Sequence, residues 1–236
     1  MPIAKHDCEI GLIGLGTMGR NLALNIAEHG FPVAVYNRTA EKTREFMATE
    51  AAGREVYPGY GLTDFVRLLR KPRAVLLMVS AGPPVDAIIE ELLPHLEPED
   101  LIIDGGNSYF CDTDRREQLL AANGLLFLGL GISGGEVGAR FGPSLMPGGS
   151  WEAYQRVWPV LEAVAAKVRG EACVTHLGAG SAGHYVKMVH NGIEYGLMQL
   201  IAETYDLLKY GLGLNNDALH EVFARWNQEE LESYLI

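Results

Sequence analysis

The sequence predicts an α/β protein, with a doubly wound, mostly parallel sheet followed by the first helices of an incomplete all-helical domain. Three features predict this fold class. Short apolar runs alternate with segments of helical spacing from residue 9 onward, which is typical of parallel strands joined by helices on both faces of a sheet. A glycine-rich turn directly follows the first apolar run, and a long, largely apolar helical pattern begins near residue 180. We therefore expect two domains, over residues 1–179 and 180–236.

The composition limits the possible functions. With 236 residues, 48% of them hydrophobic, the chain can bury a full core. Its net charge of −11 argues against a nucleic-acid partner, which needs clustered lysine and arginine. No apolar run reaches the roughly 18 residues of a membrane span, and residues 1–7 lack the apolar core of a signal peptide. We expect a soluble protein of the cytoplasm or of an organelle stroma, with no membrane partner.

The three cysteines predict neither a disulfide framework nor a metal site. Cys8, Cys111 and Cys173 are an odd number of thiols at wide spacings, which matches no paired or zinc-binding pattern. We expect reduced thiols and no bound metal.

The first strand and helix carry a dinucleotide-binding fingerprint. Residues 9–13 predict a buried strand, and Gly14, Gly16 and Gly19 follow as G-x-G-x-x-G before a helix over residues 20–29. In this context the three glycines permit a tight turn, close approach of a pyrophosphate, and close packing of helix on strand. The fingerprint therefore predicts a Rossmann-type domain, and a turn with no ligand is the alternative.

The end of the second strand, residues 33–36, indicates which dinucleotide binds. It leads into Asn37, Arg38 and Thr39, where an NAD-selective site places a carboxylate on the adenosine ribose. This stretch has no carboxylate, and Arg38 can pair with a 2′-phosphate. The sequence therefore predicts NADP, and the alternative is that Arg38 is a solvated loop residue.

The next elements place two loops at the same crevice. Helices are expected over residues 40–48, 63–69 and 85–93, and strands over residues 74–79 and 101–104. Ligands in such folds bind beyond the carboxyl ends of the strands, so residues 79–82 and 105–108 should line the cofactor crevice. The amide of Asn107 suits a hydroxyl or amide partner.

A glycine-rich segment follows the helix over residues 112–123 and the strand over residues 125–131. We expect residues 132–149 to form a long loop, in which Ser133, Gly134 and Gly135 offer a hydroxyl and backbone N–H groups to an anion. A flexible surface loop without a ligand is the alternative. A helix over residues 151–165 and a last strand over residues 172–177 complete the first domain.

The long helix that starts the second domain carries a polar stripe. Lys187, His190, Asn191 and Glu194 lie at i, i+3, i+4 and i+7, on one helical face. Because the rest of the helix is apolar nearly all round, we expect it to be buried and the stripe to face a cleft. The wet side of an amphipathic helix is the alternative. Glycines at 192 and 196 permit close approach of another helix, and Asn215 or Asn216 should cap a last helix ending near residue 226.

Together these motifs resemble the 6-phosphogluconate dehydrogenases, within the wider family of β-hydroxyacid dehydrogenases. The segments that carry the resemblance are residues 14–19, 37–39, 104–108, 131–136, 143–149 and 178–194. The resemblance implies NADP-dependent oxidative decarboxylation of 6-phosphogluconate to ribulose 5-phosphate and CO₂, in the pentose phosphate pathway. Another β-hydroxyacid dehydrogenase, such as one acting on 3-hydroxyisobutyrate, is the alternative that Glu194 and residues 104–108 disfavour.

The resemblance also implies roles for individual residues. Lys187 is the base for the C3 hydroxyl, a task that requires a neutral amine, and Glu194 is the acid that protonates the enediol. The substrate contacts implied are Asn107, Ser133, Gly134, Gly135, His190, Asn191 and Tyr195. The cofactor contacts implied are Gly14, Gly16, Met18, Gly19, Asn37, Arg38, Thr39, Val79, Ser80, Ala81 and Asn107. The family commonly has a lysine in place of Ser80, so this cofactor contact differs.

Length is the second departure from the family. Its members generally continue for about as many residues again, through a helical domain that grips the substrate phosphate and completes the site of a homodimer. We therefore expect impaired or absent turnover, and a catalytically incomplete NADP-binding module is the alternative function.

Overall fold

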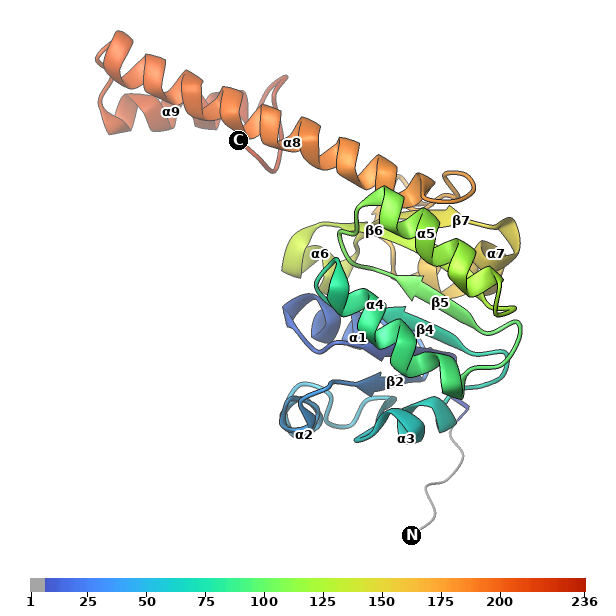
Figure 1. Cartoon of the computed structure of the whole chain (residues 1–236). Coiled ribbons are helices and arrows are strands. Elements are labelled where there is room, and N and C mark those ends of the chain that lie inside the picture. Colours follow the sequence, from blue (N-terminus) through green and yellow to red (C-terminus); the bar gives the residue numbers. More distant parts are fainter. Residues whose placement is uncertain (1–6) are drawn as a thin grey trace. The chain divides into compact units, whose positions relative to one another are not determined.

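The computed structural model describes residues 7–236; residues 1–6, part of the stretch in which the sequence predicts no signal-peptide core, lie outside the described residues. The chain separates into two compact units, one ending at Met188 and the other spanning Val189–Ile236. Figure 1 labels most of the elements of both. The strands of the main sheet are β1 (Ile10–Ile13), β2 (Val33–Tyr36), β3 (Val56–Pro58), β4 (Ala74–Leu77), β5 (Leu101–Asp104), β6 (Leu126–Ser133) and β7 (Ser144–Gly149). The helices of the first unit are α1 (Thr17–Glu28), α2 (Ala40–Ala48), α3 (Leu62–Arg67), α4 (Pro83–Leu92), α5 (Phe110–Ala121), α6 (Gly135–Phe141) and α7 (Trp151–Val164), and α8 (Ala182–Asp206) begins in it.

The sheet has a strand order that is typical of a doubly wound fold. Its seven strands run β3-β2-β1-β4-β5-β6-β7, all parallel except β7, which pairs antiparallel with β6. The strand order reverses between β1 and β4, and such a reversal opens a ligand crevice at the carboxyl ends of the strands. The α/β fold class is confirmed.

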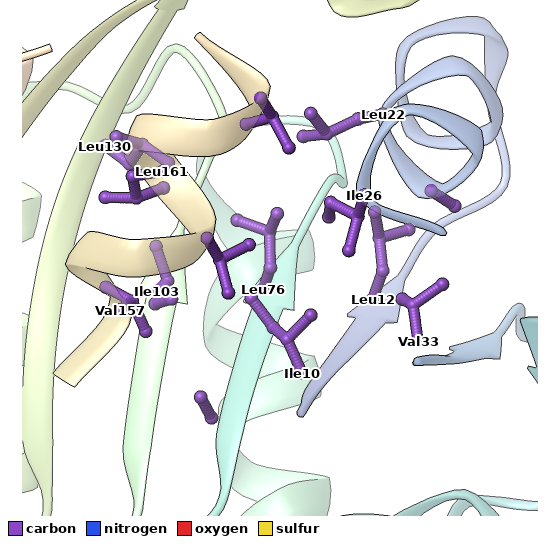
Figure 2. Close-up of a cluster of buried hydrophobic side chains, with 14 of the residues drawn as sticks. Ile10, Leu12, Leu22, Ile26, Val33, Leu76, Ile103, Leu130, Val157 and Leu161 are labelled. Atoms are coloured by element: carbon purple, nitrogen blue, oxygen red, sulfur yellow. The ribbon is translucent and has the colours of Figure 1, made fainter. Parts of the chain in front are cut away.

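Side chains that alternate along each strand fill two apolar layers. On one face of the sheet, Ile10, Leu12 and Leu76 pack with residues of α1 and α7. Figure 2 shows this layer, with Leu22 and Ile26 of α1 and Val157 and Leu161 of α7 directed at the strands. The opposite face packs against α3, α4 and α5, through residues that include Phe65, Val85, Ile89 and Leu120. Because helices cover both faces of the sheet, its buried strands hold the loops that leave their carboxyl ends in place.

The glycine-rich turn between β1 and α1 has the geometry that its sequence predicts. Gly14 adopts a φ of +107°, and a Cβ there would lie 2.4 Å from the carbonyl oxygen of Met78. A Cβ on Gly19 would lie 1.9 Å from the carbonyl oxygen of Gly14. The first glycine therefore makes the turn and the third lets α1 pack closely on it.

The predicted loop over residues 132–149 is wrong. Strand β6 continues to Ser133, α6 follows, and residues 144–149 form β7, paired with β6 from Ser133–Ser144 to Leu128–Gly149. Proline and glycine in this segment favour a loop in the sequence, but β7 lies at the edge of the sheet, where a proline without an N–H is tolerated.

Glycines in these two strands provide the surface on which the start of α8 packs. A Cβ on Gly131 of β6 would lie 2.6 Å from Cβ of Lys187, and one on Gly148 of β7 would lie 2.1 Å from the backbone nitrogen of Gly183. Gly183 itself is buried, with a hypothetical Cβ 2.3 Å from the carbonyl oxygen of Met146. Strand glycines often mark such close approach of another backbone, and here they fix the helix turn that carries Lys187.

Two further expectations about strands need correction. The predicted strand over residues 172–177 reduces to β9 (Glu171–Ala172), which forms a hairpin with β8 (Lys167–Val168), and to a single bridge between Val174 and Leu145. The polar segment before Gly61 contains the short edge strand β3, which the sequence analysis did not predict. Strand β3 has three residues, one of them a proline, and a glycine follows it, so its periodicity is too short to be recognised from the sequence.

The second unit consists of helices. It contains the later part of α8, a short π-helical turn at Leu207–Gly211 and α9 (Asn216–Trp226). The side chain of Asn215 caps α9 by accepting a hydrogen bond from the Ala218 nitrogen at 2.9 Å, as predicted.

The expectation that α8 is buried is wrong for most of its length. Only Gly183, His184 and Lys187 of this helix are buried, whereas Ile193 and Leu200 are each 61% exposed. A Cβ on Gly192 or Gly196 would meet no atom within 4 Å, so no described helix packs closely along that line. The apolar sequence correctly indicates a surface that needs covering, but the described part of the chain does not cover it.

Candidate cofactor and substrate site

A cavity of about 610 Å³ lies at the reversal of strand order, where the sequence predicts the cofactor crevice. Its walls come from the ends of β1, β2 and β4, from the first turn of α2 and from one face of α4. It brings together seven of the predicted cofactor residues, namely Gly14, Gly16, Asn37, Arg38, Thr39, Val79 and Ser80. Met18, Gly19, Ala81 and Asn107 do not line this cavity.

Asn37 holds the glycine-rich turn in place. Its Oδ1 accepts a hydrogen bond from the Leu15 nitrogen at 3.0 Å, and its Nδ2 donates to the Thr39 carbonyl at 3.1 Å. The side chain therefore joins the turn after β1 to the loop after β2. Asn37 therefore has a structural role at the edge of the crevice, because its two hydrogen bonds hold these two segments together.

The N-terminus of α1 suits a phosphate group. No side chain caps this end, and its first turn contains no acidic residue, so its free N–H groups and positive dipole end are available to an anion. Gly16 has an ordinary φ of −74°, and a Cβ built on it would meet nothing within 4 Å. Since neither strain nor packing requires a glycine there, the open space beside Gly16 fits a bound pyrophosphate.

The part of the cavity next to α2 is positively charged. Arg38 and Thr39 are exposed, and no described carboxylate forms an ion pair with Arg38. Lys42, three residues further along, lines the same cavity and was missed by the sequence analysis. The signal that could have identified Lys42 was its position in the first turn of α2, which begins directly after Arg38 and Thr39. One acidic residue, Glu91 on α4, also lines the cavity. Tyr36 lines it as well, and burial raises the pKa of its hydroxyl.

The other predicted cofactor residues have different surroundings. Met18 is half-buried and packs against the apolar layer that contains α1, and Gly19 is buried beneath the turn. Ala81 and Asn107 are exposed in the loops that follow β4 and β5. These two loops leave adjacent parallel strands. Of the residues predicted to line the crevice, 79–82 and 105–108, Val79 and Ser80 line the cavity and the others do not.

The predicted anion-binding residues lie where β6 passes into α6. Ser133 is the last residue of β6, Gly134 precedes the helix with a φ of +124°, and Gly135 begins it with a φ of +60°. Both glycines are exposed and adopt backbone conformations that other residues rarely take.

Lys187 is the buried lysine in the last turn of α8 that belongs to the first unit. Its residue is 7% exposed, and it lies against Gly131 of β6. One turn earlier, the fully buried His184 has its Nδ1 2.6 Å from Oγ1 of Thr113 on α5. Burial lowers the pKa of His184, so the imidazole is held in its neutral form. His184 was missed because a histidine among apolar residues has no distinctive spacing.

The remaining stripe residues belong to the second unit. Nδ1 of His190 lies 3.2 Å from Oδ1 of Asn191 and 3.8 Å from Oε2 of Glu194. The side chains of His190 and Glu194 are 36% and 38% exposed, and Tyr195 is 72% exposed. The three polar residues thus form one local cluster on α8, open to solvent in the described chain.

The second unit also contains an apolar groove of about 810 Å³. Its lining includes Met198, Tyr205 and Phe223 but none of the predicted site residues. This groove therefore belongs to the uncovered apolar surface of α8 and α9.

Other structural features bear on the remaining expectations. All three cysteines are free thiols, and burial raises the pKa of Cys8 to about 12. Among residues 7–236 no group of three or more histidine, cysteine or acidic side chains is arranged to hold a metal ion. No helix in that range has both the length and the apolar character needed to cross a membrane.

Comparison with protein families matches both parts of the chain. Residues 9–178 match the NAD binding domain of 6-phosphogluconate dehydrogenase, and residues 183–236 match the C-terminal domain of the same enzyme. The chain is 61% identical over 229 residues to a decarboxylating 6-phosphogluconate dehydrogenase of Synechococcus elongatus, covering 97% of this chain and 49% of that protein. It is 59% identical to an NADP⁺-dependent decarboxylating enzyme of Bacillus subtilis, covering 97% of this chain and 48% of that protein.

A solved structure shows the same likeness. The 6-phosphogluconate dehydrogenase of Plasmodium falciparum, described with NADP⁺ and with 6-phosphogluconate, superposes with a TM-score of 0.92 at 49% identity. The match covers 97% of this chain and 49% of that one. The chain thus spans about half the length of the relatives that it matches. On the match over residues 9–178, the chain belongs to the 6-phosphogluconate dehydrogenase family.

Proposed function

We propose that the chain binds NADP in its first unit and carries the acid and base residues for oxidative decarboxylation of 6-phosphogluconate to ribulose 5-phosphate. The observation that carries the cofactor assignment is the crevice at the β1–β4 reversal, with open space at Gly16 and an uncapped helix end. Arg38 and Lys42 support NADP because two cations, one in the loop after β2 and one in the first turn of α2, suit a 2′-phosphate. The Bacillus relative is NADP⁺-dependent, in agreement with this assignment.

The oxidation step assigns a base role to Lys187. NADP, when bound, accepts a hydride from C3 of the substrate. Lys187 in its neutral form takes the proton of the C3 hydroxyl, so the C3 carbon becomes a ketone. Lys187 is buried, and its Cβ packs closely on Gly131, which fixes the helix turn that carries this side chain.

The decarboxylation step needs an acid. The C1–C2 bond of the 3-keto acid breaks and CO₂ leaves. The bonding electrons form the C2–C3 double bond of an enediol, whose C3 oxygen takes back the proton held by Lys187. Glu194 then donates a proton to C2, which becomes C1 of ribulose 5-phosphate, while the C3 hydroxyl returns its proton to Lys187 and becomes the ketone. His190 and Asn191 hold substrate hydroxyls, Ser133, Gly134 and Gly135 meet its carboxylate end, and Tyr195 approaches its phosphate. The β-keto acid loses CO₂ by proton transfer alone, so the proposed steps use no metal.

A second candidate function is an NADP-binding module without turnover. The observation that favours it is the exposure of Glu194 and Tyr195, which in this chain lie open to solvent. A substrate bound there would lack a closed, water-excluding site. The family resemblance also implies a cytoplasmic homodimer, and we keep both as predictions for the chain.

Turnover separates the two candidates. NADPH formation is followed at 340 nm with 6-phosphogluconate and NADP, beside a calorimetric titration with NADP alone. If the chain turns over, Lys187→Met and Glu194→Gln should each lower the rate at least about 100-fold. Unchanged rates in both variants would contradict the assigned roles. NADP binding without NADPH formation would identify the module, and absence of NADP binding would contradict both candidates.

A further inference from the structure

A buried polar cluster lies beneath the two loops that follow β4 and β5. Its members are Asp104 at the end of β5, Ser108 and, on α5, Arg116. Asp104 and Arg116 are fully buried, and Ser108 is 6% exposed. None of these side chains has a role in the proposed binding or proton-transfer steps.

The guanidinium of Arg116 joins the two loops directly. Its Nη2 donates to the carbonyl of Gly82 at 3.0 Å, in the loop after β4. Its Nη1 donates to Oδ2 of Asp104 at 3.3 Å and to Oγ of Ser108 at 3.2 Å, on either side of the loop after β5. The guanidinium group therefore sets the spacing between the loop after β4 and the loop after β5, which leave adjacent strands.

The other edge of the guanidinium fixes its orientation. Nε and Nη2 donate to the two carboxylate oxygens of Asp86 on α4, at 2.9 and 3.0 Å. Two parallel hydrogen bonds of this kind define the plane as well as the position of the group. The arrangement also lowers the pKa of Asp86, chiefly through its hydrogen bond to Arg116.

The loop after β5 closes around the Asp104 carboxylate. Ser108 donates its hydroxyl to Oδ2 at 2.6 Å, and the Gly106 nitrogen donates to Oδ1 at 3.1 Å. Asn107, which lies between these two anchored residues, is exposed. Its position thus depends on Asp104 and, through Asp104 and Ser108, on Arg116.

A buried ion pair alone is weak evidence for stability, since apolar residues of similar volume often replace one at no cost. Here the pair makes bonds to a glycine carbonyl and to a loop serine that an apolar side chain could not make. The second half of a doubly wound sheet, which contains β4 and β5, faces the nicotinamide half of a bound dinucleotide. The adenosine half faces the ends of β1 and β2.

We propose that Arg116 is a positioning residue that sets the loops after β4 and β5 for the nicotinamide half of the cofactor. This inference rests on the proposed NADP function. It distinguishes Arg116 from its neighbour Arg115, which also bonds Asp86, at 3.0 Å, but whose side chain is 53% exposed and reaches neither loop. Arg115 therefore provides a matched control.

The test compares a whole cofactor with its adenosine half. Calorimetric titrations of the full chain use NADP and adenosine 2′,5′-bisphosphate, which lacks the nicotinamide half. The variant Arg116→Lys keeps the charge but loses the planar fork. We expect its NADP affinity to fall at least about tenfold and its affinity for the bisphosphate to stay within about twofold. Arg115→Met should leave both affinities within about twofold of the parent.

Several outcomes would overturn the proposal. Unchanged NADP affinity in Arg116→Lys would do so, as would equal weakening of both ligands, which indicates a merely structural role. If that variant fails to fold, Ser108→Ala takes its place, with an expected loss of about threefold for NADP alone; no selective loss overturns the proposal. A parent chain that binds neither ligand overturns the NADP function together with this inference, so the two failures are distinguishable.

Discussion

Two stretches of α8 have similar apolar sequences but different surroundings. In the stretch that belongs to the first unit, Gly183 and His184 are buried and Lys187 is 7% exposed. In the stretch that belongs to the second unit, Ile193 and Leu200 are each 61% exposed. The first stretch packs on glycines of β6 and β7, whereas the second unit contains no strand. The burial of a helix therefore depends on which elements face it, and its own composition shows only that it requires a partner.

The same contrast applies to the proposed chemistry. Seven of the predicted cofactor residues line a crevice whose walls all come from the first unit. The cluster of His190, Asn191 and Glu194 lies on the uncovered stretch. The described elements therefore form the walls of the cofactor crevice, whereas the proposed substrate cluster is open to solvent.

The largest expected effect tests whether the open space at Gly16 belongs to a ligand. In Gly16→Val, a branched side chain would occupy that space, and we expect NADP affinity to fall at least about 100-fold, or about 2.7 kcal/mol. Stability should change by no more than about 1 kcal/mol, because no protein atom lies within 4 Å of the new Cβ. Calorimetry and chemical denaturation measure the two effects. NADP binding equal to that of the parent would contradict the assignment of this space to the cofactor.

A pair of glycine substitutions sharpens the comparison along α8. Gly183→Ala brings a Cβ within 2.3 Å of the Met146 carbonyl oxygen, so we expect a loss of about 1–3 kcal/mol in stability. Gly192→Ala meets no atom within 4 Å and should stabilise the helix by about 0.5–1 kcal/mol. Both effects are measured by denaturation followed by circular dichroism. Equal effects in the two variants would mean that the two stretches have similar surroundings.

The smallest expected effect concerns the pH dependence of the buried end of α8. Burial lowers the pKa of His184 below its ordinary value of 6.5, so the folded chain keeps this imidazole neutral while the unfolded chain binds a proton. Stability from this source is complete above pH 6.5 and is lost as the pH falls below it, by at most about 1.4 kcal/mol per pH unit. We expect His184→Asn to reduce the fall in unfolding free energy between about pH 7 and pH 5.

An exposed histidine serves as the control for that measurement. His220 lies in the second unit and is exposed, so His220→Asn should keep the slope of the parent. A slope in His184→Asn equal to that of the parent would show that His184 does not carry the proton linkage.

The sequence predicted those parts of the fold that local pattern determines. The strand–turn–helix context of Gly14, Gly16 and Gly19 predicted the crevice, and residue type alone indicated a cap at Asn215 or Asn216, of which Asn215 caps the helix. Strand β7 was missed because its Pro147 and its glycines are tolerated only at a sheet edge against another backbone. Such tertiary reasons cannot be read from a short window of sequence.

The candidate site was predictable to a similar extent. Seven of the residues that line the crevice were named from motifs and strand ends, whereas Lys42, which also lines it, and Arg116 were not. Arg116 lies in a segment of helical spacing among charged neighbours, where most arginines face solvent. Its burial depends on Asp86 and Asp104, which are 30 and 12 residues away in sequence.

The most direct test of the account is a calorimetric titration of the chain with NADP and with NAD, repeated for Arg38→Ala. We predict that the parent binds NADP at least about tenfold more tightly than NAD, because Arg38 and Lys42 pair with the 2′-phosphate. Arg38→Ala should abolish most of this preference. Equal affinity of the parent for the two cofactors, or no binding of either, would contradict the claim that the first unit is an NADP site.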